Sequence, residues 1–161
     1  LLRVRCSGKV FQAIWHGKET VVKVCDLSKD WEYKQELLNE VAIYDDLKVL
    51  QGNFILKLID SGYFWGKMFF GIATEFAGSP LNINLLHSQE YAKAVEALSK
   101  IHEHRVLHND LHFDNILVHR INGKVKVSII DFGFSKQTDN DEELSKEMAI
   151  LIKLLHSTNK Q

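Results

Sequence analysis

The chain has 161 residues and 45% hydrophobic content, which is enough for one globular domain around one core. Its 20 basic and 21 acidic residues give a formal net charge of -1, so the composition provides no electrostatic footprint for nucleic acid. The 2 cysteines are too few for a disulfide framework, and no signal peptide or membrane-spanning apolar run is recognisable, so we expect an intracellular protein, cytoplasmic or nuclear, that binds no membrane.

The first half of the chain reads as strands with one helix. β-branched and aromatic residues predict strands over residues 10–16, 20–25, 54–59 and 63–76. Apolar residues at helical spacing predict a helix over residues 31–50. Turn-forming residues separate these strands, at His16-Gly17-Lys18-Glu19, Ser61-Gly62 and Trp65-Gly66-Lys67.

The second half follows the only proline, Pro80, and is mainly helical. Ser88 is a candidate N-cap for a helix with apolar residues every three to four positions. Asn122-Gly123, a type I′ turn signal, separates two short strands at residues 116–119 and 125–130. A final amphipathic helix begins near Leu144. The pattern predicts an α+β protein with two lobes and a hinge between them.

The most informative stretch is VLHNDLHFDNILV at residues 106–118, followed by IIDFG at residues 129–133. It places His108, Asp110, Asn115 and Asp131 in an order that phosphoryl transfer can use. A carboxylate is needed near the attacking hydroxyl, and a carboxamide with a second carboxylate can hold magnesium against phosphates. The two motifs, H-N-D-L-H-F-D-N and D-F-G, resemble the catalytic loop and the DFG segment of the protein-kinase-like superfamily.

This resemblance implies a two-lobed protein-kinase-like fold with a small β-rich N-lobe and a shortened, mainly helical C-lobe. The whole chain, residues 1–161, would form a single kinase-like domain. Residues 1–77 would supply the N-lobe and hinge, and residues 78–161 a minimal C-lobe. ATP and Mg²⁺ would bind in the cleft between the lobes.

Lys23 lies within an otherwise apolar predicted strand, T-V-V-K-V, so its ammonium must reach a cleft or an anionic partner. Taken alone, it reads most simply as an edge-strand lysine whose stem lies along apolar surface. The stretch resembles the kinase V-A-I-K strand, whose lysine contacts the α- and β-phosphates. The resemblance also implies a helix glutamate as its partner. Glu40 is that candidate, with Glu36 as the competitor one turn earlier.

The resemblance also implies a set of nucleotide-binding residues. Val10, Val21 and Leu117 would sandwich the adenine, although the same residues would suit an ordinary core. The hinge would contribute the Glu75 carbonyl, the Ala77 backbone and a gating Thr74. Gly8 matches the last glycine of the glycine-rich loop, whereas Arg3 and Arg5 replace the first two glycines, which puts tight enclosure of phosphate in doubt.

In the catalytic loop, Asp110 would be the general base and His108 would brace the loop. Asn115 and Asp131 would be the magnesium ligands. His112 stands where protein-serine/threonine kinases typically carry lysine, and it resembles the H-G-D-x-H loops of small-molecule phosphotransferases. The histidines at 102, 104, 108 and 112 offer a zinc site as the rival interpretation, although their spacing matches no zinc motif and no cysteine accompanies them.

Two departures from the ordinary kinase pattern concern regulation and substrate docking. Asn109 replaces the arginine of H-R-D, so the pairing of that arginine with a phosphorylated activation loop cannot operate, and we expect activity without loop phosphorylation. Residues 134–161 contain no A-P-E, so the peptide-docking platform of ordinary kinases is expected to be absent. Compact relatives with a similar pattern are the RIO kinases, the small kinase of the KEOPS complex and Crinkler-type effector kinases. A Crinkler-type effector would act inside a host cell.

The expected function is Mg-ATP-dependent transfer of a phosphoryl group to a protein serine or threonine, including those of the chain itself. A small-molecule hydroxyl is the next candidate acceptor. Three alternatives remain open: a pseudokinase, a nucleotide-binding interaction module and an ATPase within a larger assembly. The sequence leaves the oligomeric state undetermined.

Overall fold

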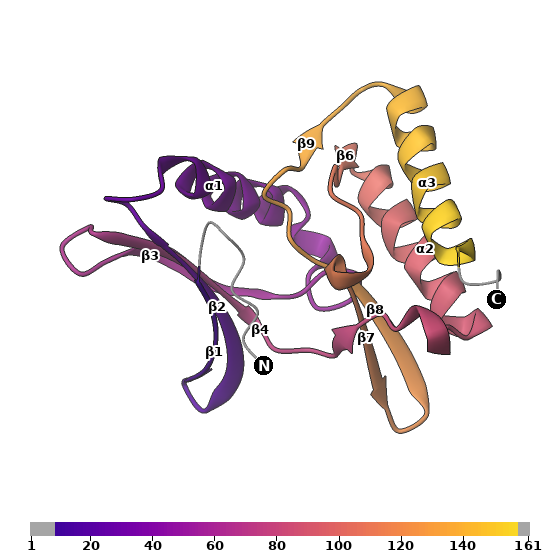
Figure 1. Cartoon of the computed structure of the whole chain (residues 1–161), viewed down its shortest axis with the longest axis horizontal. Coiled ribbons are helices and arrows are strands. Elements are labelled where there is room, and N and C mark those ends of the chain that lie inside the picture. Colours follow the sequence, from indigo (N-terminus) through magenta and orange to yellow (C-terminus); the bar gives the residue numbers. More distant parts are fainter. Residues whose placement is uncertain (1–8, 158–161) are drawn as a thin grey trace.

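A computed structural model describes residues 9–157. A four-stranded antiparallel sheet on one side of the molecule carries a helix, and two further helices with a β-hairpin form the other side (Figure 1). This is the expected α+β architecture with a small β-rich lobe and a mainly helical lobe. No helix within residues 9–157 is long and apolar enough to cross a membrane.

The N-lobe sheet has the strand order β1-β2-β4-β3. The strands are β1 (Lys9–Trp15), β2 (Lys18–Asp26), β3 (Leu58–Phe64) and β4 (Phe69–Glu75). The helix α1 (Trp31–Asp46) begins at Asp30, whose side chain accepts a hydrogen bond from the Tyr33 amide. Its buried Leu37 packs with Cys25, Phe70 and Ile72 in a small core, which fixes α1 against β2 and β4.

Three N-lobe predictions were wrong in detail. Residues 54–57 form no strand; β3 starts at Leu58. Ser61 and Gly62 form no turn, because they lie inside β3 and pair with Ile72 and Gly71 of β4. Pairing along a long neighbouring strand therefore outweighs the local turn preference of a Ser-Gly pair. The predicted helix over 31–50 ends as α1 at Asp46, and a separate 3-10 turn follows (Lys48–Leu50).

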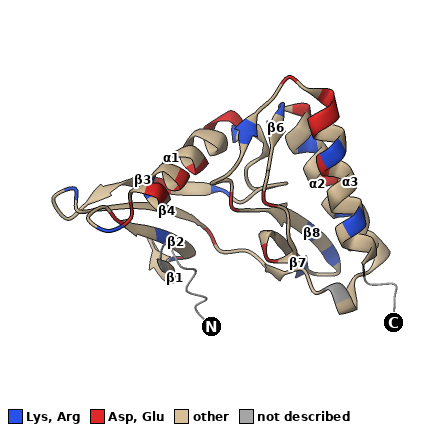
Figure 2. Ribbon diagram, turned by 45° about the horizontal axis from the view of Figure 1, so that its top comes forward, with Lys and Arg blue, Asp and Glu red and all other residues tan. Residues whose placement is uncertain are grey.

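The C-lobe core lies between α2 (Ser88–Glu103), α3 (Asp141–His156) and the hairpin of β7 (Ile116–Ile121) and β8 (Lys124–Ile129). Asn122 and Gly123 both have positive φ, 50° and 76°, as the expected type I′ turn requires. His87, not Ser88, is the N-cap of α2. Acidic residues collect in the first turn of α3 and basic ones lie further along (Figure 2), which suits the helix dipole.

Short strand pairings hold segments that connect the longer elements of the C-lobe. β5 (Ser79–Pro80) pairs with β7, and β6 (Val106–Leu107) pairs with β9 (Lys136–Gln137). A Cβ on Gly78 would lie 2.5 Å from the Val118 carbonyl oxygen, and Gly78 has a φ of 70°. Only glycine therefore fits where the interlobe segment crosses the hairpin. The β6–β9 pairing brings the H-N-D loop and the D-F-G segment side by side.

Candidate active site

The cleft contains an ion cluster made of Lys23, Glu40 and Asp131. The Lys23 ammonium on β2 lies 2.9 and 2.8 Å from the two carboxylate oxygens of Glu40 on α1, and 3.1 Å from Oδ1 of Asp131. The small core under α1 sets the first contact, because it presents Glu40, and not the competitor Glu36, to the strand lysine. These three residues come from three separate parts of the sequence.

The electrostatics of this cluster favour a bound cation. Burial alone would lower the pKa of Lys23, but the carboxylates of Glu40 and Asp131 raise it above its ordinary value. Burial raises the pKa of Glu40, and the positive charge of Lys23 offsets part of that rise. One ammonium thus faces two carboxylates, so the ionised cluster carries one excess negative charge, which attracts a divalent cation.

The catalytic loop is held in place by the buried side chain of His108. Its Nε2 lies 2.8 Å from the Ile130 carbonyl oxygen and its Nδ1 lies 3.2 Å from the Asp110 amide nitrogen. The first contact requires a proton on Nε2 and the second requires none on Nδ1, so the ring is neutral. Burial lowers the pKa of His108, in agreement with that neutral form. His108 therefore ties the Asp110 loop to the residue before Asp131.

Asn115 lies between Asp110 and the D-F-G segment. Its Nδ2 donates to the Asp110 carbonyl at 2.9 Å and to Oδ2 of Asp110 at 3.3 Å. Its backbone oxygen accepts from the Ile130 amide at 3.0 Å. Since the amide nitrogen faces Asp110, the side-chain oxygen of Asn115 is the atom that a metal would contact. His112 lies beside Asp110, with Nε2 3.5 Å from Oδ2.

A cavity of about 250 Å³ lies next to the ion cluster. Of the residues predicted to hold a nucleotide, Val21, Lys23, Thr74, Ala77 and Leu117 line it, together with Asp131. Val10 of β1 pairs with Lys23 of β2, but neither Val10 nor Glu75 is among the residues that line the cavity. Gly8, Arg3 and Arg5 lie outside the described residues. The cavity thus gathers most of the predicted pocket, and the roles of all these residues stay predictions.

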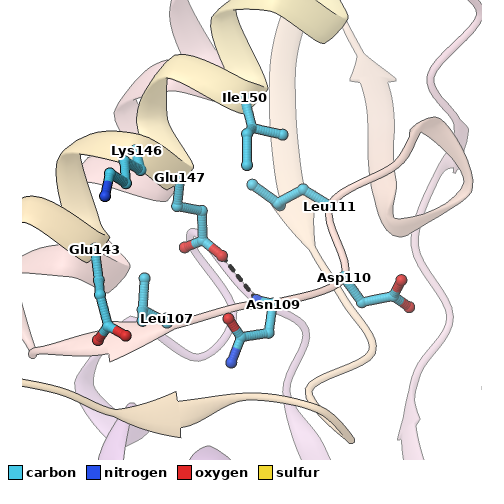
Figure 3. A pocket seen from close by; sticks show the side chains of 8 residues that line it. All are labelled: Leu107, Asn109, Asp110, Leu111, Glu143, Lys146, Glu147 and Ile150. Atoms are coloured by element: carbon cyan, nitrogen blue, oxygen red, sulfur yellow. Dashed lines mark hydrogen bonds between the residues drawn. The ribbon is translucent and has the colours of Figure 1, made fainter.

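Glu147, a buried carboxylate on α3, holds the catalytic loop and was not predicted from the sequence (Figure 3). Its Oε1 accepts from the Asn109 amide at 2.7 Å, and its Oε2 accepts from the His108 amide at 3.0 Å. Oε2 also lies 2.7 Å from Nε2 of His102 on α2. These hydrogen bonds lower the pKa of Glu147 in spite of its burial, which acts in the opposite direction. An acidic residue between Leu144 and Leu151 on the apolar face of the last helix was the available signal.

We expect Glu147→Gln to lower the free energy of unfolding by about 3 kcal/mol near neutral pH, because hydrogen bonds to a buried charge contribute about 1.5–3 kcal/mol each. Since the fold lowers the pKa of Glu147 from 4.5, its stabilisation is complete above pH 4.5 and is lost as pH falls through the lowered value. Urea unfolding of both proteins at about pH 7 and about pH 3 measures this. The exposed Glu142→Gln is the control. Equal stability of wild type and Glu147→Gln at neutral pH would contradict the assignment.

Within residues 9–157, no group of three or more histidine, cysteine, aspartate or glutamate side chains is placed to hold a metal ion. The zinc interpretation therefore gains no support from these residues. His102 and His108 are instead engaged by Glu147 and Ile130. The oxygen donors of Asn115 and Asp131 suit magnesium, which keeps waters and phosphate oxygens among its ligands.

In the small antiparallel sheet, a strand lysine contacts a helix glutamate. The loop and hairpin on the other side of the cleft carry Asp110, Asn115 and Asp131. Together these features define the two-lobed protein kinase class. The chain belongs to the protein kinase domain family, whose model matches residues 6–151.

Three curated relatives are serine/threonine-protein kinases by name. The chain is 27% identical over 151 residues to the serine/threonine-protein kinase ste20 of Aspergillus fumigatus, covering 88% of this chain and 18% of the relative. It is 28% identical over 139 residues to the serine/threonine-protein kinase SMU1 of Mycosarcoma maydis, covering 81% of this chain and 18% of that protein. It is 31% identical over 156 residues to the probable serine/threonine-protein kinase fnkE of Dictyostelium discoideum, covering 84% of this chain and 12% of that protein. The chain thus spans less than a fifth of each relative's length, and the resemblance to the compact kinases stays a prediction.

Proposed function

We propose that this domain is an Mg-ATP-dependent phosphotransferase that acts on serine or threonine hydroxyls of proteins, including its own. The observation that carries the proposal is the contact of Lys23 with both Glu40 and Asp131. A lysine held by a helix glutamate is positioned to bind phosphate, and Asp131 beside it can hold the metal that bridges the phosphates. The family and the names of the relatives support a kinase of this kind.

The residues present fit both cofactors. Val21 and Leu117 would contact the adenine, and the Ala77 backbone would bind its edge. The Glu75 carbonyl, the other hinge contact that the resemblance implies, belongs to a residue that does not line the cavity. Lys23 would contact the α- and β-phosphates, while Asn115 and Asp131 would hold Mg²⁺ through oxygen atoms. When bound, Mg²⁺ neutralises the charge that develops on the phosphates during transfer. The excess negative charge of the ion cluster suits that cation.

Asp110 is the proposed general base. Its carboxylate is turned away from α3 (Figure 3) and lies within hydrogen-bond reach of Asn115. The acceptor oxygen would form its bond to the γ-phosphorus as the bond to the β,γ-bridging oxygen breaks, and its proton would pass to Asp110. His112, beside Asp110, would donate a hydrogen bond to the transferred phosphoryl group.

A second cavity of about 410 Å³ lies between the catalytic loop and α3, and Asp110, Leu111 and Ile150 are among its lining residues (Figure 3). Because the Asp110 carboxylate is turned away from α3, we do not assign this cavity to the acceptor. A small-molecule alcohol is the second candidate acceptor. The short connection between β9, which ends at Gln137, and α3, which begins at Asp141, favours it, because a short connection offers little surface for a peptide.

We expect ATP to raise the melting temperature mainly in the presence of Mg²⁺, because Asp131, one of the two proposed metal ligands, lines the cleft and a ligand that binds the folded state stabilises it. Thermal unfolding with ATP plus Mg²⁺, ATP plus EDTA, and Mg²⁺ alone measures this. Equal ATP shifts with Mg²⁺ and EDTA would count against the metal assignment. No shift with saturating ATP under either condition would remove the kinase proposal.

A further inference from the structure

Four consecutive carbonyl groups that follow Asp131 lie within hydrogen-bond distance of two asparagine side chains. Nδ2 of Asn39 lies 3.3, 3.0 and 2.8 Å from the carbonyl oxygens of Phe132, Gly133 and Ser135. Nδ2 of Asn109 lies 3.1 Å from the remaining one, that of Phe134. We call this pair of side chains, Asn39 and Asn109, the asparagine clamp.

The two asparagines approach the segment from different lobes. Asn39 lies on α1 directly before Glu40, so the helix that holds Lys23 also holds the segment after Asp131. Asn109 lies in the catalytic loop, where the bond from its amide to Glu147 at 2.7 Å fixes its backbone. The clamp therefore joins α1, the catalytic loop and the D-F-G segment.

The clamped segment contains few internal hydrogen bonds that would stabilise its conformation. Residues 130–135 belong to no helix or strand, and within the segment the Ser135 amide donates to the Phe132 carbonyl. Asp131 has a φ of 71°, a left-handed conformation that is unfavourable for a non-glycine residue and persists where the surroundings impose it. The Phe132 ring is buried against Tyr44 and His108, which anchors one point of the segment.

We propose that Asn39 and Asn109 are positioning residues that hold Asp131 toward the cleft, and that they do so without a phosphorylated activation loop. The proposal rests on the proposed function, since it assigns Asp131 to the metal. Asn109 stands where the H-R-D pattern has an arginine that binds a phosphorylated loop. An uncharged amide bonded to a backbone carbonyl needs no phosphate.

The test uses two uncharged variants, Asn39→Leu and Asn109→Gly. Leucine keeps the side-chain size and suits a helix, and glycine readily adopts the φ of 64° at position 109. Asn53→Ala, at an exposed turn position, is the matched control. All proteins are treated with phosphatase first.

Two readouts separate positioning from general stability. The first is hydrogen exchange of the amides in residues 132–136 without ligand, which we expect to become about tenfold faster in each variant and to stay unchanged in Asn53→Ala. The second is the Mg²⁺ concentration at half-maximal transfer with saturating ATP, which we expect to rise about tenfold, while ATP affinity in EDTA stays at the wild-type value.

Wild-type exchange and wild-type Mg²⁺ dependence in both variants would overturn the clamp. Faster exchange over the whole domain, with equal loss of ATP affinity in EDTA, would also overturn it, because that pattern indicates a general structural role. If the wild type neither binds Mg-ATP nor transfers phosphate, the proposed function fails, and the exchange experiment still decides whether the two asparagines hold the segment.

Discussion

Asp110→Asn is expected to lower the rate of phosphoryl transfer about a hundredfold or more, which is the usual scale for losing a positioned general base. Its Mg-ATP affinity is expected to stay nearly unchanged. Asp110 is among the residues that line the cavity beside α3, with its carboxylate turned away from α3, and it is absent from the lining of the nucleotide cleft. Asparagine keeps the size of the side chain and removes its basicity. Because the change leaves the cleft lining intact, we expect the turnover rate to fall while the affinity for Mg-ATP is kept.

Initial rates with labelled ATP, together with calorimetric ATP affinity in Mg²⁺, measure that separation. Asp139→Asn, in the exposed loop between β9 and α3, is the matched control and should transfer phosphate at the wild-type rate. A wild-type rate in Asp110→Asn would remove Asp110 from the catalytic role. A parallel loss of nucleotide affinity would assign it to binding instead.

Asp131→Asn is expected to weaken Mg-ATP binding about tenfold or more and to lower turnover by a larger factor, because it removes a negatively charged metal ligand. In the wild type, Asp131 and Glu40 share the Lys23 ammonium, and the cluster carries one excess negative charge. The substitution cancels that charge. Glu40 still holds Lys23 in the variant, so the phosphate-binding lysine should stay in place.

Calorimetry with ATP in Mg²⁺ and in EDTA provides the measurement and its internal control. The variant and the wild type should differ in Mg²⁺ and agree in EDTA. The same affinity for both proteins in Mg²⁺ would show that Asp131 holds no metal, and a similar loss in EDTA would show that it contacts the nucleotide directly.

The parts of the fold that short-range patterns determine could be predicted from the sequence. The Asn122-Gly123 turn has the φ values that its type requires, so the hairpin that carries Asn115 and Asp131 to the cleft was predictable. The Lys23–Glu40 contact was also expected, because the resemblance named both the strand lysine and the helix glutamate. The start of β3 was mispredicted because pairing with β4, and not local composition, decides that boundary.

The supports of the site could not be predicted, because they are contacts of side chains with distant backbone. Asn39 reaches carbonyl groups 93 to 96 residues away, and Glu147 reaches amides 38 and 39 residues away. The identity of a polar residue on a helix does not indicate which distant backbone group its side chain will contact. Glu147 did interrupt an apolar helix face, whereas Asn39 stands next to Glu40 in a stretch of mixed polar and apolar residues.

The most direct test of the central claim is a transfer assay with γ-labelled ATP and the purified, phosphatase-treated chain. It is scored for label on the chain itself, on an acceptor protein and on small-molecule alcohols, and for free phosphate. We expect Mg²⁺-dependent label on serine or threonine, absent in EDTA and lowered about a hundredfold or more in Asp110→Asn. Binding of Mg-ATP without transfer to any of these acceptors would contradict the account and favour a pseudokinase.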